Sequence, residues 1–575
     1  MRIIGIRKAS AADGSSHNGA GFVSNRIAVT IRRGFALALA FALILALCAS
    51  CAGGGVGGGG SGGSGVTGGG AGGGSGGEEL VWQDKLARAL SVEPLPYEAP
   101  RPQDRPDETG RTWYQVFVYS FCDSNGDGVG DLNGVTERLD YIALTGFDGV
   151  WLSPIHPSDT YHKYDVKDYY SIDPEYGTME DFERFMDACR ERGLKVLLDL
   201  VVNHTSIDHP WFEEHPEYYH IQDEPGHGQW KQLPDGKYYE CQFWERMPDL
   251  NLEYPELRAE LEAVIAFWLG KGVDGFRLDA VKEFETGNAE INIEILSWIT
   301  HAAKAIKPDA YIVGEDWDTT DALYRYYQSG VDSLFSFPFA GADGPIGKTL
   351  IQNAPLADYL EKLVSSQDSI KENNPRGTAA PFFTNHDNAR AAGFLRKNPD
   401  LIKTAWGMSL MQPGDAFVYY GEELGMSGSG KDENKRAPMF WTDEQGAEGM
   451  TSGPPGMDGV THSFPPAAEQ AGDENSIYSY LRKAVLLRAK YPEIGRGDIA
   501  IIDLGLGAEA AGRVGAVERT WEGGKIIIIY NVSPDEARIP MEGHSPADFL
   551  SASGAEPALQ GGVLVLPGYT IAILI

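Results

Sequence analysis

The stretch Gly275-Phe-Arg-Leu-Asp-Ala-Val-Lys282 indicates both the fold and the chemistry of this 575-residue chain. It overlaps a strand-like run, Val273 to Val281, that has the length of a buried strand. On a strand, residues i and i+2 point the same way, so Arg277 lies beside Asp279. A guanidinium favours the ionised form of a neighbouring carboxylate, which can then act as a nucleophile. An isolated Arg-x-Asp pair is more often structural, so the interpretation depends on the rest of the chain.

Polar clusters also follow three other apolar runs. They are Asp199-Leu-Val-Val-Asn-His204, Val313-Gly-Glu315 and Phe382-Phe-Thr-Asn-His-Asp387. This recurrence favours a catalytic reading of Asp279, because a purely structural pair needs no partners at the ends of other strands.

From Thr112 onward, short β-rich runs alternate with amphipathic helices. The runs are Trp113 to Phe121, Gly149 to Ser153, Lys195 to Val202, Gly275 to Val281, Ala310 to Gly314, Ser333 to Pro338, Pro381 to Thr384 and Ala416 to Tyr420. Eight strands with intervening helices predict a (β/α)8 barrel, an α/β fold whose catalytic groups gather at the carboxyl ends of the strands. The four polar clusters fall at such ends. Alternation alone leaves a doubly wound sheet as an alternative.

The predicted barrel occupies residues 111–204 and 255–497. A connection as long as residues 205–254 is normally functional or a small inserted domain. Residues 498–575 change to alternating β patterns with Gly and Pro turns, which predicts a C-terminal β-sandwich.

The N-terminal region has the features of an export signal. Arg32-Arg33 precede an apolar run, Phe35 to Leu47, that is short for a membrane span and typical of a signal-peptide core. We therefore predict a signal peptide over residues 1–51, with a bacterial lipoprotein type of cleavage site at which Cys51 is lipidated. A Gly-rich tether and linker follow over residues 52–110. The expected location is the periplasmic or outer face of a membrane, with free secretion as the alternative.

The composition excludes some partners. The formal net charge is −34, and such an acidic surface repels phosphate backbones, so we expect no nucleic-acid partner. An acidic surface is compatible with a neutral substrate.

Together, and in this order, the four polar stretches are similar to the signature regions of the α-amylase family of glycoside hydrolases, and the resemblance extends over about residues 111–575. It implies that the insertion after the third strand is domain B, which walls one side of the cleft. It also implies that Asp279 is the nucleophile, Glu315 the acid/base and Asp387 the stabiliser of the distorted sugar. All three carboxyl residues are present, which argues against a non-catalytic sugar-binding homologue.

The resemblance also implies a set of substrate contacts. They are Tyr164, Asp165, His204, Arg277, Lys282 and His386. Tyr164 corresponds to a stacking platform for the sugar at the cleavage subsite, since aromatic rings suit the apolar faces of pyranoses. Lys163 stands before it, where the family usually has Gly.

The segment Asp123-Ser-Asn-Gly-Asp-Gly-Val-Gly-Asp131 alternates oxygen-bearing side chains with glycines, which can wrap around a hard cation such as calcium. It does not complete an EF-hand, because Gly134 stands where the bidentate Glu is required. The family resemblance implies a structural calcium ion bound by Asp123, Asn125, Asp127, the Val129 carbonyl and Asp131. A metal-free turn is the alternative.

The residue after the predicted nucleophile is Ala280. In the family a Val there accompanies α-1,6 specificity and Ala accompanies α-1,4 specificity. We therefore expect a retaining hydrolase of internal α-1,4 bonds in starch, glycogen or maltodextrins. An α-glucosidase, a neopullulanase or an oligo-1,6-glucosidase of the same family are the alternatives.

Overall fold

The computed structural model describes residues 81–91, 110–541 and 544–575. The predicted signal peptide, the lipidation of Cys51 and the Gly-rich stretch before residue 81 lie outside these residues. Within the described ranges, we find no helix with the length and apolarity needed to cross a membrane.

Eight parallel strands form one sheet in the order β10-β9-β8-β7-β3-β2-β1-β11. Their bounds are β1 Thr112–Val116, β2 Gly149–Leu152, β3 Lys195–Leu200, β7 Gly275–Leu278, β8 Tyr311–Gly314, β9 Ser333–Phe335, β10 Thr378–Ala380 and β11 Ala416–Tyr419. A parallel bridge between Phe382 and Phe417 joins the chain after β10 to β11, so the sheet nearly closes on itself. The predicted (β/α)8 barrel is confirmed, and the doubly wound alternative is wrong.

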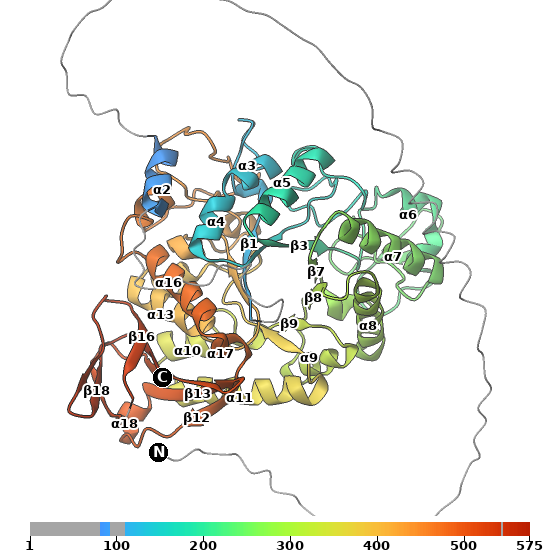
Figure 1. Ribbon diagram of the computed structural model, residues 1–575. Coiled ribbons are helices and arrows are strands. Elements are labelled where there is room, and N and C mark those ends of the chain that lie inside the picture. The colour runs from blue at the N-terminus through green and yellow to red at the C-terminus, as the bar shows by residue number, and fades with distance from the viewer. Residues whose placement is uncertain (1–80, 92–109, 542–543) are drawn as a thin grey trace, which may run out of the picture. The chain divides into compact units, whose positions relative to one another are not determined.

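Helices cover the outside of these strands, as Figure 1 shows for α5, α7 and α8 around β3, β7 and β8. The main ones are α3 Leu132–Glu137, α4 Leu139–Thr145, α5 Met179–Glu191, α7 Pro255–Gly270, α8 Ala289–Ile306, α9 Thr320–Tyr326, α10 Pro345–Ile351, α11 Leu356–Asn373, α13 Pro399–Leu410 and α16 Ile477–Lys490. Local sequence sets their ends. At the start of α5, for example, Thr178 and Asp181 form a reciprocal capping box.

The seventh barrel strand lies earlier in the chain than the sequence predicts. It is Thr378–Ala380, whereas the apolar run suggests Pro381 to Thr384. Pro381 has no N–H group to donate to a neighbouring strand. Its carbonyl still accepts a hydrogen bond from the Phe417 amide at 2.8 Å, so the predicted residues begin the strand-end loop.

Large side chains fill the barrel interior. The buried cluster consists of Trp113, Trp151, Leu197, Tyr311, Val313, Phe335, Ala380, Phe382 and Phe417. Gly149 is required beside it, because a Cβ there would lie 2.4 Å from the Trp113 ring. The Arg277 guanidinium lies 5.2 Å from the centre of the Trp151 ring, so the aromatic layer supports the polar residues of the strand ends.

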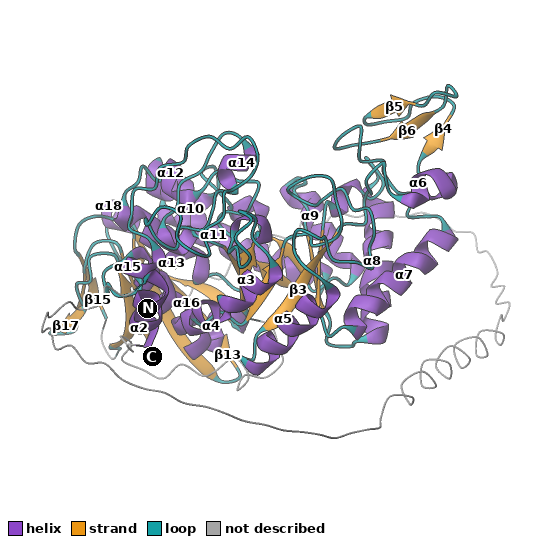
Figure 2. Ribbon diagram, turned by 90° about the horizontal axis from the view of Figure 1, so that it is seen from above, coloured by secondary structure: helices purple, strands orange, loops and turns teal. Residues whose placement is uncertain are grey.

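An insertion separates β3 from α7. It contains α6 Pro210–Glu214 and a small antiparallel sheet of β4 Ile221–Gln222, β5 Trp230–Gln232 and β6 Tyr238–Glu240, in the order β4-β6-β5. Figure 2 shows this sheet beside α6 and apart from the barrel strands. A bridge between His204 and Asp249 ties the returning chain to the end of β3. The predicted insertion after the third strand is confirmed.

The C-terminal residues form two antiparallel sheets. One has the order β12-β13-β14-β19-β16 and the other β15-β18-β17. The bounds are β12 Asp498–Ile502, β13 Val514–Trp521, β14 Gly524–Asn531, β15 Ala537–Pro540, β16 Pro546–Ser551, β17 Ala558–Gln560, β18 Val563–Leu566 and β19 Thr570–Leu574. Ile529 of the first sheet packs in one buried cluster with Ile539 and Leu564 of the second, as in a β-sandwich.

A short helix, α2 (Trp82–Ser91), lies within the segment that the sequence suggests is a linker. Trp82 is buried and stacks on Trp441 with ring centres 6.0 Å apart. The Arg138 guanidinium lies 4.7 Å from the centre of the Trp82 ring, and the Trp82 indole donates to the Glu448 carbonyl at 3.2 Å. The helix is therefore docked against the barrel, with Trp82, Leu86 and Leu90 buried.

Candidate active site

A cavity of about 560 Å³ lies at the carboxyl ends of the barrel strands. It is lined by His162, Tyr164, His204, Phe243, Trp244, Met247, Asp279, Ala280, Glu315, Trp317, Phe337, His386, Asp387, Asp432 and Arg436. The side chains that the sequence places at the ends of different strands thus meet in one cavity. The strand-end argument anticipates this convergence for Asp279, Glu315 and Asp387.

Arg277 lies beneath the cavity and binds three carboxyl groups. Its Nη1 lies 2.6 Å from Asp199 Oδ1 and 2.6 Å from Asp279 Oδ1, and its Nη2 lies 2.6 Å from Glu315 Oε2. The guanidinium is only 1% exposed. One buried cation therefore serves three acids that repel one another.

This shortage of positive charge favours bound protons. Burial raises the pKa of Glu315 to about 8, and repulsion from Asp279 and Asp387 adds to the effect while Arg277 opposes it. Burial likewise raises the pKa of Asp199 to about 7. Glu315 is consequently suited to give up a proton near neutral pH.

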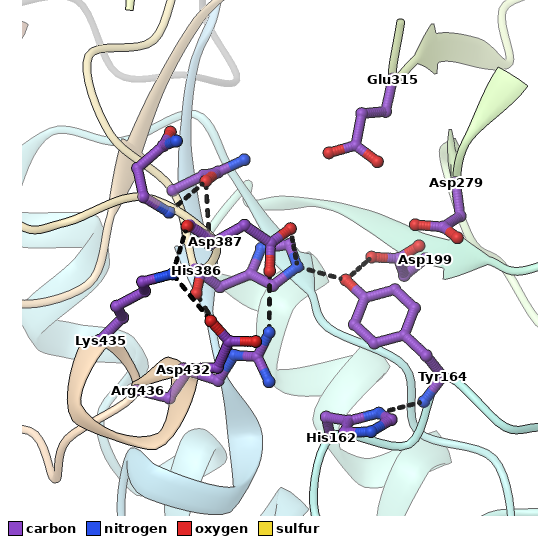
Figure 3. Close-up of polar contacts among 12 residues, drawn as sticks. His162, Tyr164, Asp199, Asp279, Glu315, His386, Asp387, Asp432, Lys435 and Arg436 are labelled. Carbon is purple, nitrogen blue, oxygen red and sulfur yellow. Dashed lines mark hydrogen bonds and ion pairs between the residues drawn. The ribbon is translucent and has the colours of Figure 1, made fainter. Parts of the chain in front are cut away.

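Asp387 lies on the other side of the cavity, beside Arg436 and His386 (Figure 3). Arg436 Nη2 lies 2.8 Å from Asp387 Oδ1, and His386 Nε2 lies 3.2 Å from Asp387 Oδ2. Desolvation would raise the pKa of Asp387, but its contact with His386 and its attraction to Arg436 and Arg277 outweigh desolvation and lower that pKa to about 2. Asp387 is therefore anionic at neutral pH.

Tyr164 connects the two sides. Its hydroxyl donates to Asp199 Oδ2 at 3.0 Å and lies 2.7 Å from His386 Nε2, and its ring stacks on His386 at 5.5 Å. Gln115 Nε2 lies 2.8 Å from His386 Nδ1. If the Gln115 amide donates to Nδ1, then His386 Nε2–H donates to Tyr164 and Tyr164 donates to Asp199, which gives every group a partner.

Other predicted contact residues lie in different places. His204 is buried and lines the cavity. Asp165 is buried in its own loop, where it accepts hydrogen bonds from Ser158 and Thr160. Lys282 Nζ lies 5.4 Å from the centre of the Trp317 ring. Neither Asp165, Lys282 nor Arg277 is among the described residues that line the cavity.

The structure adds cavity residues that the sequence argument missed. Phe243 and Trp244 come from the insertion, and Trp317 lies two residues after Glu315. The exposed fractions of these three residues are 43%, 41% and 37%. The aromatic residue two places after Glu315 is a signal that could have been used. Arg436 offers no such signal, because it lies 49 residues after Asp387 in the chain.

The candidate calcium loop has suitable donor types but no preformed cluster of acids. Asp123 Oδ1 accepts from the Asn125 and Gly126 amides, Asp127 Oδ1 accepts from the Val129 amide, and Asp131 Oδ1 accepts from the Gly134 amide. Within the described residues, no three or more His, Cys, Asp or Glu side chains are grouped closely enough to hold a metal. Calcium here would depend on amide and carbonyl oxygens as well as on carboxylates.

A proton-bearing carboxyl beside a second carboxylate, at the carboxyl end of a (β/α)8 barrel and among exposed aromatic rings, defines the class of glycoside hydrolases. Comparison with known proteins agrees. Residues 115–497 match the family described as "Alpha amylase, catalytic domain". The chain belongs to the α-amylase family of glycoside hydrolases.

Individual relatives support this membership. The chain is 39% identical over 398 residues to Alpha-amylase 3 of Dictyoglomus thermophilum, covering 67% of this chain and 78% of that protein. It is 30% identical over 492 residues to an oligo-1,6-glucosidase of Parageobacillus thermoglucosidasius, covering 68% of this chain and 84% of that protein. The solved structure of Eubacterium rectale Amy13B is similar with a TM-score of 0.78 and 38% identity, covering 83% of this chain and 99% of that one.

Proposed function

We propose that the protein is a retaining hydrolase that cleaves internal α-1,4-glucosidic bonds of starch, glycogen or maltodextrins. The observation that carries the proposal is the sharing of Arg277. Asp279 and Glu315 bind different nitrogens of one guanidinium, which holds the two carboxyl groups side by side. Retaining enzymes need such a close pair, about 5 to 5.5 Å apart, whereas inverting enzymes leave room for a water between them.

In the first step, an Asp279 oxygen attacks the anomeric carbon while Glu315 gives its proton to the glycosidic oxygen, and the leaving glucan departs with a new hydroxyl. In the second step, Glu315 takes a proton from water, which displaces Asp279 and releases the sugar. Asp387 remains anionic and stabilises positive charge on the distorted sugar. NMR of freshly released sugar should show the α anomer first, and an initial β product would contradict the retaining mechanism.

Other side chains would bind the sugar. Tyr164 supplies an aromatic face and fixes Asp199, while His204 and His386 supply polar atoms for hydroxyl groups. Burial lowers the pKa of both histidines below the usual range, so they act as neutral hydrogen-bonding groups. Arg277 acts through the carboxyl groups that it binds.

The preference for α-1,4 bonds rests on Ala280. This residue adjoins Asp279, lines the cavity and has a left-handed backbone with φ of 50°. A β-branched residue would crowd the scissile bond and would also be strained in this conformation. The small side chain leaves space beside the nucleophile.

Endo action is supported by the exposed rings of Phe243, Trp244 and Trp317, which offer surfaces for further sugar units of a polymer. The test is the loss of viscosity of soluble starch against the release of reducing ends, with isomaltose and pullulan assayed beside it. Rapid viscosity loss with little isomaltose cleavage is expected. Glucose released stepwise from chain ends, or faster isomaltose turnover, would favour an α-glucosidase or oligo-1,6-glucosidase, and the similarity to an oligo-1,6-glucosidase makes the latter the second candidate.

We also propose that the loop from Asp123 to Asp131 binds calcium through Asp123, Asn125, Asp127, the Val129 carbonyl and Asp131. The alternating oxygen donors support it. A ligand that binds only the folded state raises the melting temperature. Chelation should therefore lower it, and calcium, but not magnesium, should restore it. A melting curve that chelation leaves unchanged would contradict the proposal.

Export with a lipid anchor is supported by the apolar run before Cys51 and the glycine-rich stretch after it. The Cys51→Ala variant should move from the membrane fraction to the soluble exported fraction. A wild-type protein that is already soluble outside the cell would contradict lipidation while agreeing with simple secretion.

A further inference from the structure

Lys163 has an unusual environment for a lysine. Its side chain is only 2% exposed, and its Nζ lies 3.0 Å from Asp173 Oδ2 and also binds Glu175. The Nζ lies 5.4 Å from the centre of the Tyr176 ring. A buried ammonium is retained only when it is well paired, so this contact is specific.

The Asp173 carboxylate that receives Lys163 is itself fixed. Its Oδ2 accepts from the Ser158 amide at 3.0 Å, and its Oδ1 accepts from the Glu175 amide at 2.9 Å. Asp173 therefore holds two points of the loop after β2, at Ser158 and at Lys163. Through Asp173, the last part of this loop is tied to its beginning and its middle.

The backbone of Lys163 is strained. Its φ is 64°, in the left-handed region that glycine adopts freely and that is unfavourable for other residues. Such strain persists only where the surrounding structure holds it, and it is concentrated at functional sites.

The two neighbours of Lys163 enter the active-site cavity. His162 and Tyr164 both line it, and His162 Nδ1 accepts a hydrogen bond from the Tyr164 amide at 3.2 Å. The Lys163 side chain is buried among Asp173, Glu175 and Tyr176 of the same loop. A shift of this backbone would move the Tyr164 hydroxyl away from Asp199 and His386.

We propose that Lys163 is a positioning residue for Tyr164: its buried ion pair with Asp173 holds the strained backbone that presents Tyr164 to Asp199, His386 and the sugar. The inference rests on the role proposed above for Tyr164. It assigns a task to the ammonium that glycine, the usual family residue, cannot perform, although glycine suits the backbone.

The test is a double-mutant cycle with Lys163→Gly, Lys163→Met and Tyr164→Ala, in which kcat/KM per folded enzyme is measured below every melting transition. Misplacement by about 1 Å can cost about 100-fold in rate, so Lys163→Gly and Lys163→Met should each lower kcat/KM by about 10- to 100-fold. In the Tyr164→Ala background the same changes should cost less than about threefold, because residues that act as a unit are not additive. Asp173→Asn should reproduce the loss if the Lys163 variants fold poorly.

Lys167→Met is the matched control, because Lys167 forms an exposed pair with Asp159 in the same loop at 2.8 Å. It should leave kcat/KM unchanged. Wild-type activity in Lys163→Gly, or losses that add fully to that of Tyr164→Ala, would overturn the positioning role and leave that of Tyr164 intact. Wild-type activity in Tyr164→Ala would overturn the proposed role of Tyr164 and this inference with it.

Discussion

The two sides of the cavity differ in their balance of charge. On one side, Asp199, Asp279 and Glu315 share the single guanidinium of Arg277. On the other side, Asp387 binds the Arg436 side chain, and Lys435 donates to its backbone carbonyl at 2.8 Å. The pKa of Glu315 is accordingly raised to about 8, whereas that of Asp387 is lowered to about 2.

This difference shows how one cavity can keep a proton on one acid and exclude it from another. Burial by itself would raise the pKa of Glu315 and of Asp387, so the supply of cations decides which of the two is protonated. The proposed proton donor, Glu315, lies where one cation is shared by three acids, and the proposed stabilising anion, Asp387, has the Arg436 guanidinium beside it.

The largest effects should come from the acid-rich side. Asp279→Asn should lower kcat by about 10⁴-fold or more, since it removes the attacking group. Glu315→Gln should be comparably slow on starch but much less impaired on aryl glycosides, whose leaving groups need no proton. Glu290→Gln, on the exposed surface of α8, is the control. Equal sensitivity of both variants to the leaving group would contradict the assigned roles.

The pH dependence of kcat/KM tests the same acid-rich side of the cavity. Because Glu315 must be protonated, kcat/KM on starch should fall about tenfold per pH unit above pH 8, near its pKa of about 8. This pKa lies above the ordinary value of 4.5, so the folded state binds the extra proton and Glu315 makes unfolding easier as pH rises from 4.5 to about 8. Glu315→Gln should lack the alkaline limb on aryl glycosides, and a limb that remained would have another origin.

Arg436→Met tests the cation-rich side. Loss of the guanidinium should raise the pKa of Asp387 by about 1 unit or more, so the acid limb of the kcat/KM profile should move upward. Because the pKa of Asp387 is lowered, its contribution to stability is present above its ordinary value of 3.8 and is lost as pH falls through about 2. Arg436→Met should therefore be less stable, relative to wild type, at neutral pH than at pH 2.

Lys431→Met, which removes an exposed pair with Asp458, controls for changes elsewhere in the loop that carries Arg436. It should leave both limbs of the profile in place. An unchanged acid limb in Arg436→Met would contradict the role of Arg436 in keeping Asp387 ionised.

The smallest effect is expected beside the nucleophile. Ala280→Val should raise the ratio of isomaltose to maltotriose turnover severalfold, since one methyl-scale change in a pocket is worth about 1 to 3 kcal/mol. It should also lower the free energy of unfolding, because a β-branched residue is more strained than alanine in the left-handed conformation. Ala280→Gly should relieve the strain without changing linkage preference in this direction, and an unchanged ratio in Ala280→Val would contradict the linkage argument.

The barrel and the meeting of Asp279, Glu315 and Asp387 could be predicted, because strand periodicity and the gathering of strand ends are encoded locally. The approach of Arg436 to Asp387 could not, since it depends on how a distant loop folds back over the barrel. Two residues that are adjacent in a sequence motif need not both contact the cavity. Asp165 follows Tyr164 directly, yet it bonds within its own loop while Tyr164 faces the cavity.

The docking of α2 attaches the N-terminal part of the chain to the barrel at a second place, in addition to β1. Trp82, Leu86 and Leu90 are buried, and Trp82 packs against both Trp441 and Arg138. The helix thus has the contacts of a bound peptide that happens to be covalently attached. If the chain is cut between α2 and β1, the two pieces should stay associated. A pulling force on the N-terminal end should act first on the Trp82 contacts, before it reaches β1.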